Sequence, residues 1–223
     1  MTPMHRNLLQ NWPGLMVLLI GMLLIGCSTS SERYHPQYAV YRQTIQRVLL
    51  LPPEINIFAE NPDGNLLWQN GASQAAQRYI QQAVAQTLAA HQFSVRMADA
   101  EMIGRSDVHN VKALFRSVNR AIQLHTYGPQ LFPTKQRVFE YGLGSVADIL
   151  ASGHADALVL VIGHQTLSQS RPKSWISIAV IEPGGNIIWY SMQGARQDLG
   201  LQTSSGALTL VSQTLHNFVG VQS

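Results

Sequence analysis

The single cysteine of the chain, Cys27, is the residue whose type and position most directly suggest chemistry. It follows an uncharged apolar run at residues 15–26 and precedes the hydroxyl-rich stretch at residues 28–31. A thiol in such a place can be a buried core residue, a reactive nucleophile or the attachment point of another group. The surrounding residues decide between these roles, because they also determine the compartment in which the protein works.

The residues before Cys27 have the features of a secretory signal peptide. The apolar run is 12 residues long, which is too short to span a membrane, since a spanning helix needs roughly 20 residues. The sequence Leu24-Ile25-Gly26-Cys27 resembles the lipobox of bacterial lipoproteins. This resemblance implies that the Cys27 thiol receives a diacylglyceryl group, that the signal is cut between Gly26 and Cys27, and that the new amino terminus is acylated.

The same resemblance implies a destination. In this family an aspartate after the lipidated cysteine favours retention in the inner membrane, so Ser28 implies the outer membrane of a Gram-negative bacterium. The domain is then lipid-anchored and faces the periplasm. Several acyl chains on one residue form a lasting anchor, because each buried methylene contributes about 0.8 kcal/mol. The alternatives are an ordinary cleaved signal with a chance cysteine, and a buried core cysteine.

Lipidation of Cys27 would leave the mature chain without a free thiol. We therefore expect no disulfide, no cysteine nucleophile and no thiolate metal site in residues 27–223. The net charge of +3 becomes +2 when Arg6 leaves with the signal. A chain this close to neutral has no strong electrostatic attraction for nucleic acid, so we expect no nucleic-acid partner.

Sequence motifs for catalysis and for metal binding are absent, including G-x-S-x-G, H-E-x-x-H, the phosphate-binding loop and the dinucleotide fingerprint. The histidines that follow Cys27 form no i,i+4 pair and no close cluster, so we expect no metal site and no cofactor except the lipid. Asp148, Asp156, Glu140 and Glu182 could converge in space, but acid–base pairs have no sequence signature. We therefore identify no catalytic residue.

The best candidate for a binding site is the irregular segment at residues 125–141, which we call the 125–141 segment. Loops longer than about 12–15 residues are usually functional or mobile, and aromatic and basic side chains suit a protein or glycan contact. The alternative is a structural loop whose aromatic side chains lie back on the core. The predicted partner-binding residues are His125, Tyr127, Phe132, Lys135, Arg137, Phe139 and Tyr141.

Composition divides the chain into a signal peptide at residues 1–26, a lipidated flexible tether at 27–44 and a periplasmic α/β domain at 45–223. Residue periodicity predicts helices near 73–91, 106–122, 146–151 and after 204. Ser73 is the predicted N-cap of the first helix, and Phe115 belongs to the predicted apolar stripe of the second. Periodicity predicts strands near 47–51, 55–58, 65–68, 93–97, 157–162, 175–181 and 187–192. The turn residues Asn61-Pro-Asp-Gly64 predict that the second and third of these strands form a hairpin. The continuous apolar run at 157–162 is typical of a strand buried on both faces. We expect a single compact α/β sandwich with a mixed sheet and flanking helices.

Residues 145–200 resemble periplasmic lipoprotein domains with the anticodon-binding-like α/β fold, such as the curli-secretion CsgG-type and the penicillin-binding-protein activator LpoB-type domains. The resemblance rests on ADALVLV from residue 155 and GNIIW from residue 185. Glu182 stands where aspartate is usual in these domains, and residues 47–97 match only loosely. The resemblance implies a fold and transfers no catalytic residue, because such domains act by binding.

Three functions remain open at this point. The first is a non-enzymatic docking, assembly or accessory lipoprotein that contacts an envelope protein, with a homo-oligomer also compatible with the sequence. The second is a hydrolase or transferase acting on cell-wall material, which would need histidine and carboxylate groups converging in a cleft. The third is a subunit of an outer-membrane secretion complex, which ranks last because the tight turns leave no room for strands of roughly 9–11 residues that cross a membrane.

Overall fold

The computed structural model describes residues 31–128, 132–168, 173–194 and 200–220. The lipobox residues Gly26, Cys27 and Ser28 lie outside these ranges, so lipidation and signal cleavage stay predictions. The described residues from Ser31 onwards belong to one compact unit. Within the described ranges, no helix combines the length and the apolar character that crossing a membrane requires.

The elements follow the predicted mixture of helices and strands. The strands are β1 (Ser31–Tyr34), β2 (Arg47–Leu50), β3 (Glu54–Glu60), β4 (Leu66–Trp68), β5 (Ser94–Met97), β6 (Ala157–Leu167), β7 (Lys173–Ile181) and β8 (Ile187–Gly194). The helices are α2 (Tyr38–Thr44), α3 (Asn70–Ala90), α4 (Ala100–Ile103), α5 (Ser106–Ile122), the π-helical turn η1 (Gln123–Tyr127), α6 (Pro133–Arg137), α7 (Ala147–Gly153) and α8 (Ser204–Gly220).

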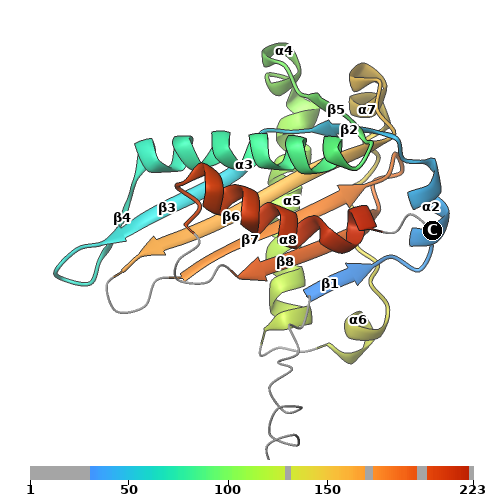
Figure 1. Ribbon diagram of the computed structural model, residues 1–223. Helices are drawn as coiled ribbons and strands as arrows, with labels where there is room; N and C mark the ends of the chain where they lie inside the picture. The colour runs from blue at the N-terminus through green and yellow to red at the C-terminus, as the bar shows by residue number, and fades with distance from the viewer. Residues whose placement is uncertain (1–30, 129–131, 169–172, 195–199, 221–223) are drawn as a thin grey trace, which may run out of the picture. The chain divides into compact units, whose positions relative to one another are not determined.

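The strands form one eight-stranded mixed sheet, which confirms the predicted α/β class (Figure 1). The main strand order is β1-β8-β7-β6-β2-β5, and β3 pairs with both β6 and β4. Both β2 and β3 run parallel to β6, one beside its first residues and the other beside its last. Pro52 and Pro53 lie between β2 and β3. Proline has no amide hydrogen to donate to a neighbouring strand, so the chain cannot continue as one uninterrupted central strand there.

The predicted central strand β6 is buried on both faces. Val159 and Val161 belong to one hydrophobic cluster, and Leu158 and Leu160 belong to the other. Successive side chains of a strand point to opposite faces of the sheet, so a strand covered on both sides must be apolar at every position. The continuous apolar run therefore correctly predicted a strand at the centre of the sheet.

Helices cover both faces of this sheet. The helices α3 and α8 pack side by side on one face, and α5 crosses the other face (Figure 1). The apolar stripe of α5 includes Phe115, as predicted, but it is continued by the buried Asn119. The Asn119 carboxamide oxygen accepts hydrogen bonds from the hydroxyls of Ser177 at 2.8 Å and Tyr190 at 2.9 Å. These bonds satisfy a polar group that burial would otherwise penalise.

The start of α3 differs from the prediction that Ser73 caps it. The helix begins at Asn70, and Ser73 lies within its first turns with 1% of its surface exposed. The Ser73 hydroxyl accepts a hydrogen bond from the backbone amide of Ile57 at 3.0 Å. Ser73 therefore ties the helix to β3, next to the hairpin that β3 forms with β4.

Residues 31–44, which the sequence predicts to be part of a flexible tether at 27–44, instead form a strand and a helix. β1 pairs antiparallel with β8, so that Ser31 lies opposite Met192 and Tyr34 lies opposite Trp189. The sheet therefore includes residues well before the predicted domain start at 45. The polar composition concealed this strand, because an edge strand with one solvated face needs few apolar residues.

Candidate functional site

The 125–141 segment lies against the α5 face of the sheet and contains regular structure. Gln123–Tyr127 continues α5 as a π-helical turn, and Pro133–Arg137 forms the short helix α6. Residues 129–131 lie outside the described part of the chain. The seven predicted partner-binding residues are therefore spread over two helical turns and the extended stretch that follows α6.

Three of the predicted residues point into the protein. Phe139 is only 4% exposed, and its ring centroid lies 6.1 Å from that of Tyr190. The ring of Tyr127 stacks on Tyr190 with centroids 6.3 Å apart. Tyr141 packs against the hydrophobic cluster that contains Tyr190. Burial raises the pKa of Tyr127 to about 12. These aromatic side chains hold the segment on the core.

The two basic residues of the segment make local contacts. The Lys135 ammonium donates a hydrogen bond to the Glu140 carbonyl at 2.9 Å and lies 4.7 Å from the centroid of the Tyr141 ring. Arg137 donates from Nε to the Pro133 carbonyl at 3.4 Å, and its side chain remains exposed. Lys135 thus contributes to the shape of the segment, whereas Arg137 projects from α6 into solvent.

Few of the predicted side chains of the 125–141 segment are exposed to solvent. Phe132 is 51% exposed, and its ring meets the imidazole of His125 edge to face with centroids 4.5 Å apart. His125 itself is half-buried. Of the seven predicted residues, Phe132 and Arg137 are the two classed as exposed. The structure therefore does not gather the predicted residues into one outward surface.

A second set of exposed apolar side chains lies on the β3–β4 hairpin, where β4 is the edge strand at one end of the sheet (Figure 1). We call Leu66, Leu67 and Trp68 the hairpin patch. Their side chains are 51%, 52% and 57% exposed, although they are large and apolar and occupy consecutive positions. They make up the whole of β4, which pairs with β3 alone among the described strands.

The hairpin patch adjoins a row of aromatic rings that crosses three strands. Trp68 lies opposite Phe58 on β3. The Phe58 ring stacks on the imidazole of His164 with centroids 5.2 Å apart, and His164 stacks on Trp175 of β7 at 6.1 Å. Burial lowers the pKa of His164, and its Nε2 lies 3.0 Å from the Thr166 hydroxyl oxygen. This half-exposed row extends the apolar surface from the hairpin onto the sheet.

The sequence predicted the hairpin but missed its exposed surface. Asn61 and Gly64 form the expected turn, in which the Asn61 side-chain oxygen accepts from the Asn65 amide at 2.8 Å. Adjacent side chains of a strand point to opposite faces, so Leu66 and Leu67 cannot both face a core on one side of the sheet. Three consecutive large apolar residues next to a hairpin turn are the feature of the sequence that could have predicted an exposed apolar surface here.

Two of the four carboxylates that the sequence left as acid–base candidates, Asp156 and Glu182, make structural contacts. Asp156 accepts from the Arg47 guanidinium at 2.6 Å, which lowers the pKa of that carboxyl group. Glu182 accepts from the backbone amides of Gly184 at 2.7 Å and Asn186 at 2.9 Å, and so braces the β7–β8 turn. Within the described ranges, His, Cys, Asp and Glu side chains form no group of three or more that could hold a metal ion.

Comparisons with known proteins leave the family of the chain unassigned. No protein-family model matches it, and no curated protein matches its sequence. Among solved structures, the chain is similar to the LpoB C-terminal domain from Salmonella enterica, with 14% identity, a TM-score of 0.31, and coverage of 73% of this chain and 94% of that one. It is also similar to lipoprotein GNA1162 from Neisseria meningitidis, with 11% identity, a TM-score of 0.34, and coverage of 79% and 98%. At these TM-scores neither likeness carries an argument about function.

Proposed function

We propose that this chain is a lipid-anchored envelope lipoprotein that acts without catalysis, as a docking, assembly or accessory factor for another envelope protein. The observation that supports this function best is the hairpin patch. Leu66, Leu67 and Trp68 are each about half exposed at the end of the sheet. Large apolar side chains left exposed on both faces of an edge strand suit a partner that grips this edge, and tryptophan is among the residues that most often dominate binding energy.

The hairpin also offers a specific way to bind a partner. β4 has β3 as its one neighbour among the described strands, so its outer edge can accept an extended segment from another protein. Backbone hydrogen bonds would supply affinity in such a pairing, and alternate side chains would supply specificity. Leu66 and Trp68 would contact the partner on one face of the hairpin and Leu67 on the other.

The ordered first strand shortens the predicted anchor. Cys27 precedes Ser31, the first residue of β1, by four residues. Four residues span at most about 14 Å, whereas a flexible tether to residue 44 would span several times that distance. A lipid on Cys27 would therefore hold the folded domain close to the surface of the outer membrane.

Replacement of Cys27 tests the anchor. We expect Cys27→Ala to block lipidation, so that unprocessed precursor accumulates or the domain leaves the membrane fraction. Fractionation and gel mobility after metabolic labelling with palmitate measure this directly. A Cys27→Ala chain that fractionates and migrates as the wild-type chain does would rule out the lipoprotein assignment.

Replacement of Trp68 tests the docking surface. We expect Trp68→Ser to reduce recovery of envelope proteins in a crosslinked pulldown of the lipidated chain. Leu208→Ser is the matched control, because Leu208 is also exposed and apolar but lies on α8, away from the hairpin. Equal recovery of the same partners with both variants would exclude the hairpin patch as the docking surface.

A further inference from the structure

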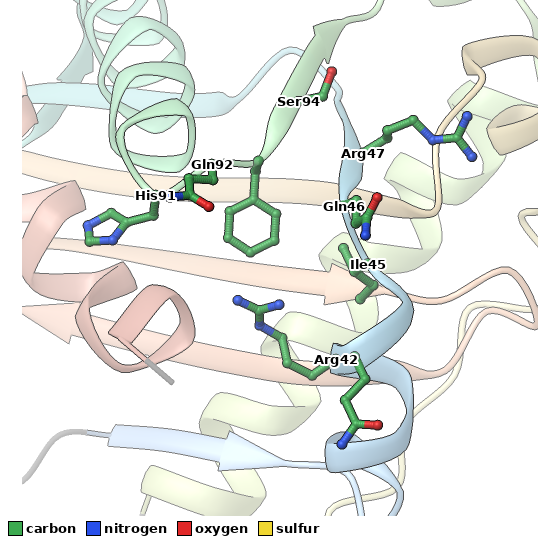
Figure 2. Close-up of a pocket in the computed structure, with 9 residues that line it drawn as sticks. Arg42, Ile45, Gln46, Arg47, His91, Gln92 and Ser94 are labelled. Atoms are coloured by element: carbon green, nitrogen blue, oxygen red, sulfur yellow. The ribbon is translucent and has the colours of Figure 1, made fainter. Parts of the chain in front are cut away.

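A cavity of about 460 Å³ lies at the beginning of β2 and β5, away from the hairpin patch (Figure 2). One wall comes from the end of α2 and the start of β2, and includes Arg42 and Gln46. The other wall is the turn from α3 into β5, and includes His91, Phe93 and Ser94. Cavities of roughly 300–1,000 Å³ accommodate small ligands. No aspartate or glutamate is among the described residues that line this one.

The half-buried Arg42 is the central side chain of the cavity. Its guanidinium extends from α2 into the cavity (Figure 2). It lies 4.6 Å from the centroid of the Phe93 ring and 5.1 Å from that of Phe218. Its Nε donates to the Phe218 carbonyl at 3.3 Å, and the guanidinium also interacts with the Tyr38 hydroxyl. Both of these partners are neutral and leave the charge of Arg42 unbalanced, so an anionic oxygen supplied by a ligand would stabilise it.

Arg47, the second arginine of the cavity, already has an anionic partner. Its guanidinium contacts Asp156 at 2.6 Å, and the backbone amides of Gln46 and Arg47 donate to the same carboxylate at 3.1 and 2.8 Å. No such ion pair joins Arg42 to a carboxylate of the described residues. The positive charge of Arg42 therefore remains available to a ligand.

The rim of the cavity carries additional hydrogen-bond donors. The Gln46 carboxamide is exposed on the same wall as Arg42, whereas the Ser94 hydroxyl points away from the guanidinium (Figure 2). Gln92, in the turn that forms the other wall, has a backbone φ of 68°. This left-handed conformation after a helix is normally occupied by glycine, and here it positions a long amide side chain at the rim. Strained backbone of this kind often occurs at binding sites.

We propose that this cavity binds an oxyanion, either a carboxylate or a phosphate group, through Arg42, with Gln46 as a supporting donor. The planar guanidinium presents its nitrogen–hydrogen bonds in a geometry that matches both anions. The stacked rings of Phe93 and Phe218 fix the orientation of Arg42 before the ligand arrives, which reduces the entropic cost of binding.

The test uses the full-length protein in detergent, with arginine side chains labelled for NMR, titrated with inorganic phosphate and separately with acetate. We expect the Arg42 Nε–H signal and the Ser94 amide signal to shift and to saturate, with a dissociation constant on the order of 1 mM. Arg42→Met should weaken the Ser94 response about tenfold, because a charge-assisted hydrogen bond is lost. Arg78→Met, which removes an exposed arginine on α3, should leave the response unchanged.

The outcomes separate the two sources of the oxyanion. Saturation by both probes supports a carboxylate-bearing ligand, and saturation by phosphate alone supports a phosphorylated one. If Arg42→Met fails to fold, Arg42→Lys keeps the charge but removes the planar fork, and binding should be several-fold weaker than in the wild-type protein. Shifts that never saturate, or shifts that are equal in wild type and both Arg42 variants, would overturn the proposal.

Discussion

The β3–β4 hairpin and the 125–141 segment both carry large apolar side chains outside the central strands, but they place them in opposite ways. In the hairpin, Trp68 has more than half of its surface in solvent. In the segment, Phe139 is almost completely buried against Tyr190. The hairpin ends in an edge strand of the sheet, whereas the segment closes one of the layers that cover the sheet.

This difference shows that irregular conformation and aromatic content do not by themselves identify a binding surface. The aromatic residues of the 125–141 segment cover the α5 face of the sheet, where Tyr127 and Phe139 lie on either side of Tyr190. The side chains of the hairpin patch are instead about half exposed, and exposed apolar surface of this kind is typical of an interaction site. Four predictions test this contrast, starting with the largest effect.

The two regions should differ most in their contribution to stability. We expect Phe139→Ala to lower the free energy of unfolding by about 3–5 kcal/mol, because it leaves a cavity in the core. Trp68→Ala should lower it by only about 0.5 kcal/mol, as is usual for a surface position. Urea unfolding followed by circular dichroism measures both. Equal losses would show that the hairpin patch is part of the core.

Partner binding should show the reverse order. We expect Trp68→Ala to weaken the complex about 30-fold, which corresponds to the roughly 2 kcal/mol of a hot-spot residue. Phe132→Ala, at the exposed position of the 125–141 segment, should change affinity by less than about threefold. Titration of the purified partner, once crosslinking has identified it, measures both constants. A larger loss with Phe132→Ala would return the docking surface to the segment.

High pH should destabilise the 125–141 segment through Tyr127, in addition to the effect of Tyr190 and Tyr38, whose pKa burial also raises. Because burial raises the pKa of Tyr127 to about 12 in the folded protein, the unfolded chain ionises first, near its ordinary value of about 10. The unfolded state then binds fewer protons, so stability is complete below pH 10 and falls as pH rises from about 10 to about 12. Tyr127→Phe should reduce this fall, and Trp68→Ala should not. An identical fall in all three proteins would contradict the assigned burial of Tyr127.

The smallest effect concerns Lys135. Replacing it with methionine removes the hydrogen bond to the Glu140 carbonyl and the contact with the Tyr141 ring. At this partly exposed site we expect a loss of about 0.5–1 kcal/mol in the free energy of unfolding and no change in partner binding. Weaker binding without any loss of stability would instead place Lys135 in the docking surface.

The sequence predicted those parts of the fold that depend on local periodicity. The two-sided burial of β6, the β3–β4 hairpin and the Phe115 stripe of α5 all follow from residue spacing and turn chemistry. The mixed sheet and flanking helices were therefore predictable. The edge strand β1 was not, because its residues are polar and it is held by pairing with β8, which is distant in sequence.

The sites were less predictable than the fold, because exposure depends on which elements cover a residue. The three consecutive apolar residues at 66–68 are a hint, but they do not by themselves show that β4 is an edge strand whose side chains are all exposed. The same limit applies to Arg42, whose cavity is formed by α2 and by the turn into β5 about 50 residues later. Such sites depend on contacts between distant segments, which residue spacing in one sequence does not reveal.

In-cell photocrosslinking tests the central claim most directly. A photoreactive phenylalanine analogue is placed at position 67 in one full-length chain and at position 132 in another, since Leu67 and Phe132 have nearly the same exposure. We predict a discrete crosslinked product to an envelope protein from position 67, lost when Trp68 is also replaced by serine, and little or none from position 132. A product from position 132 alone would contradict the assignment of the hairpin patch as the docking surface.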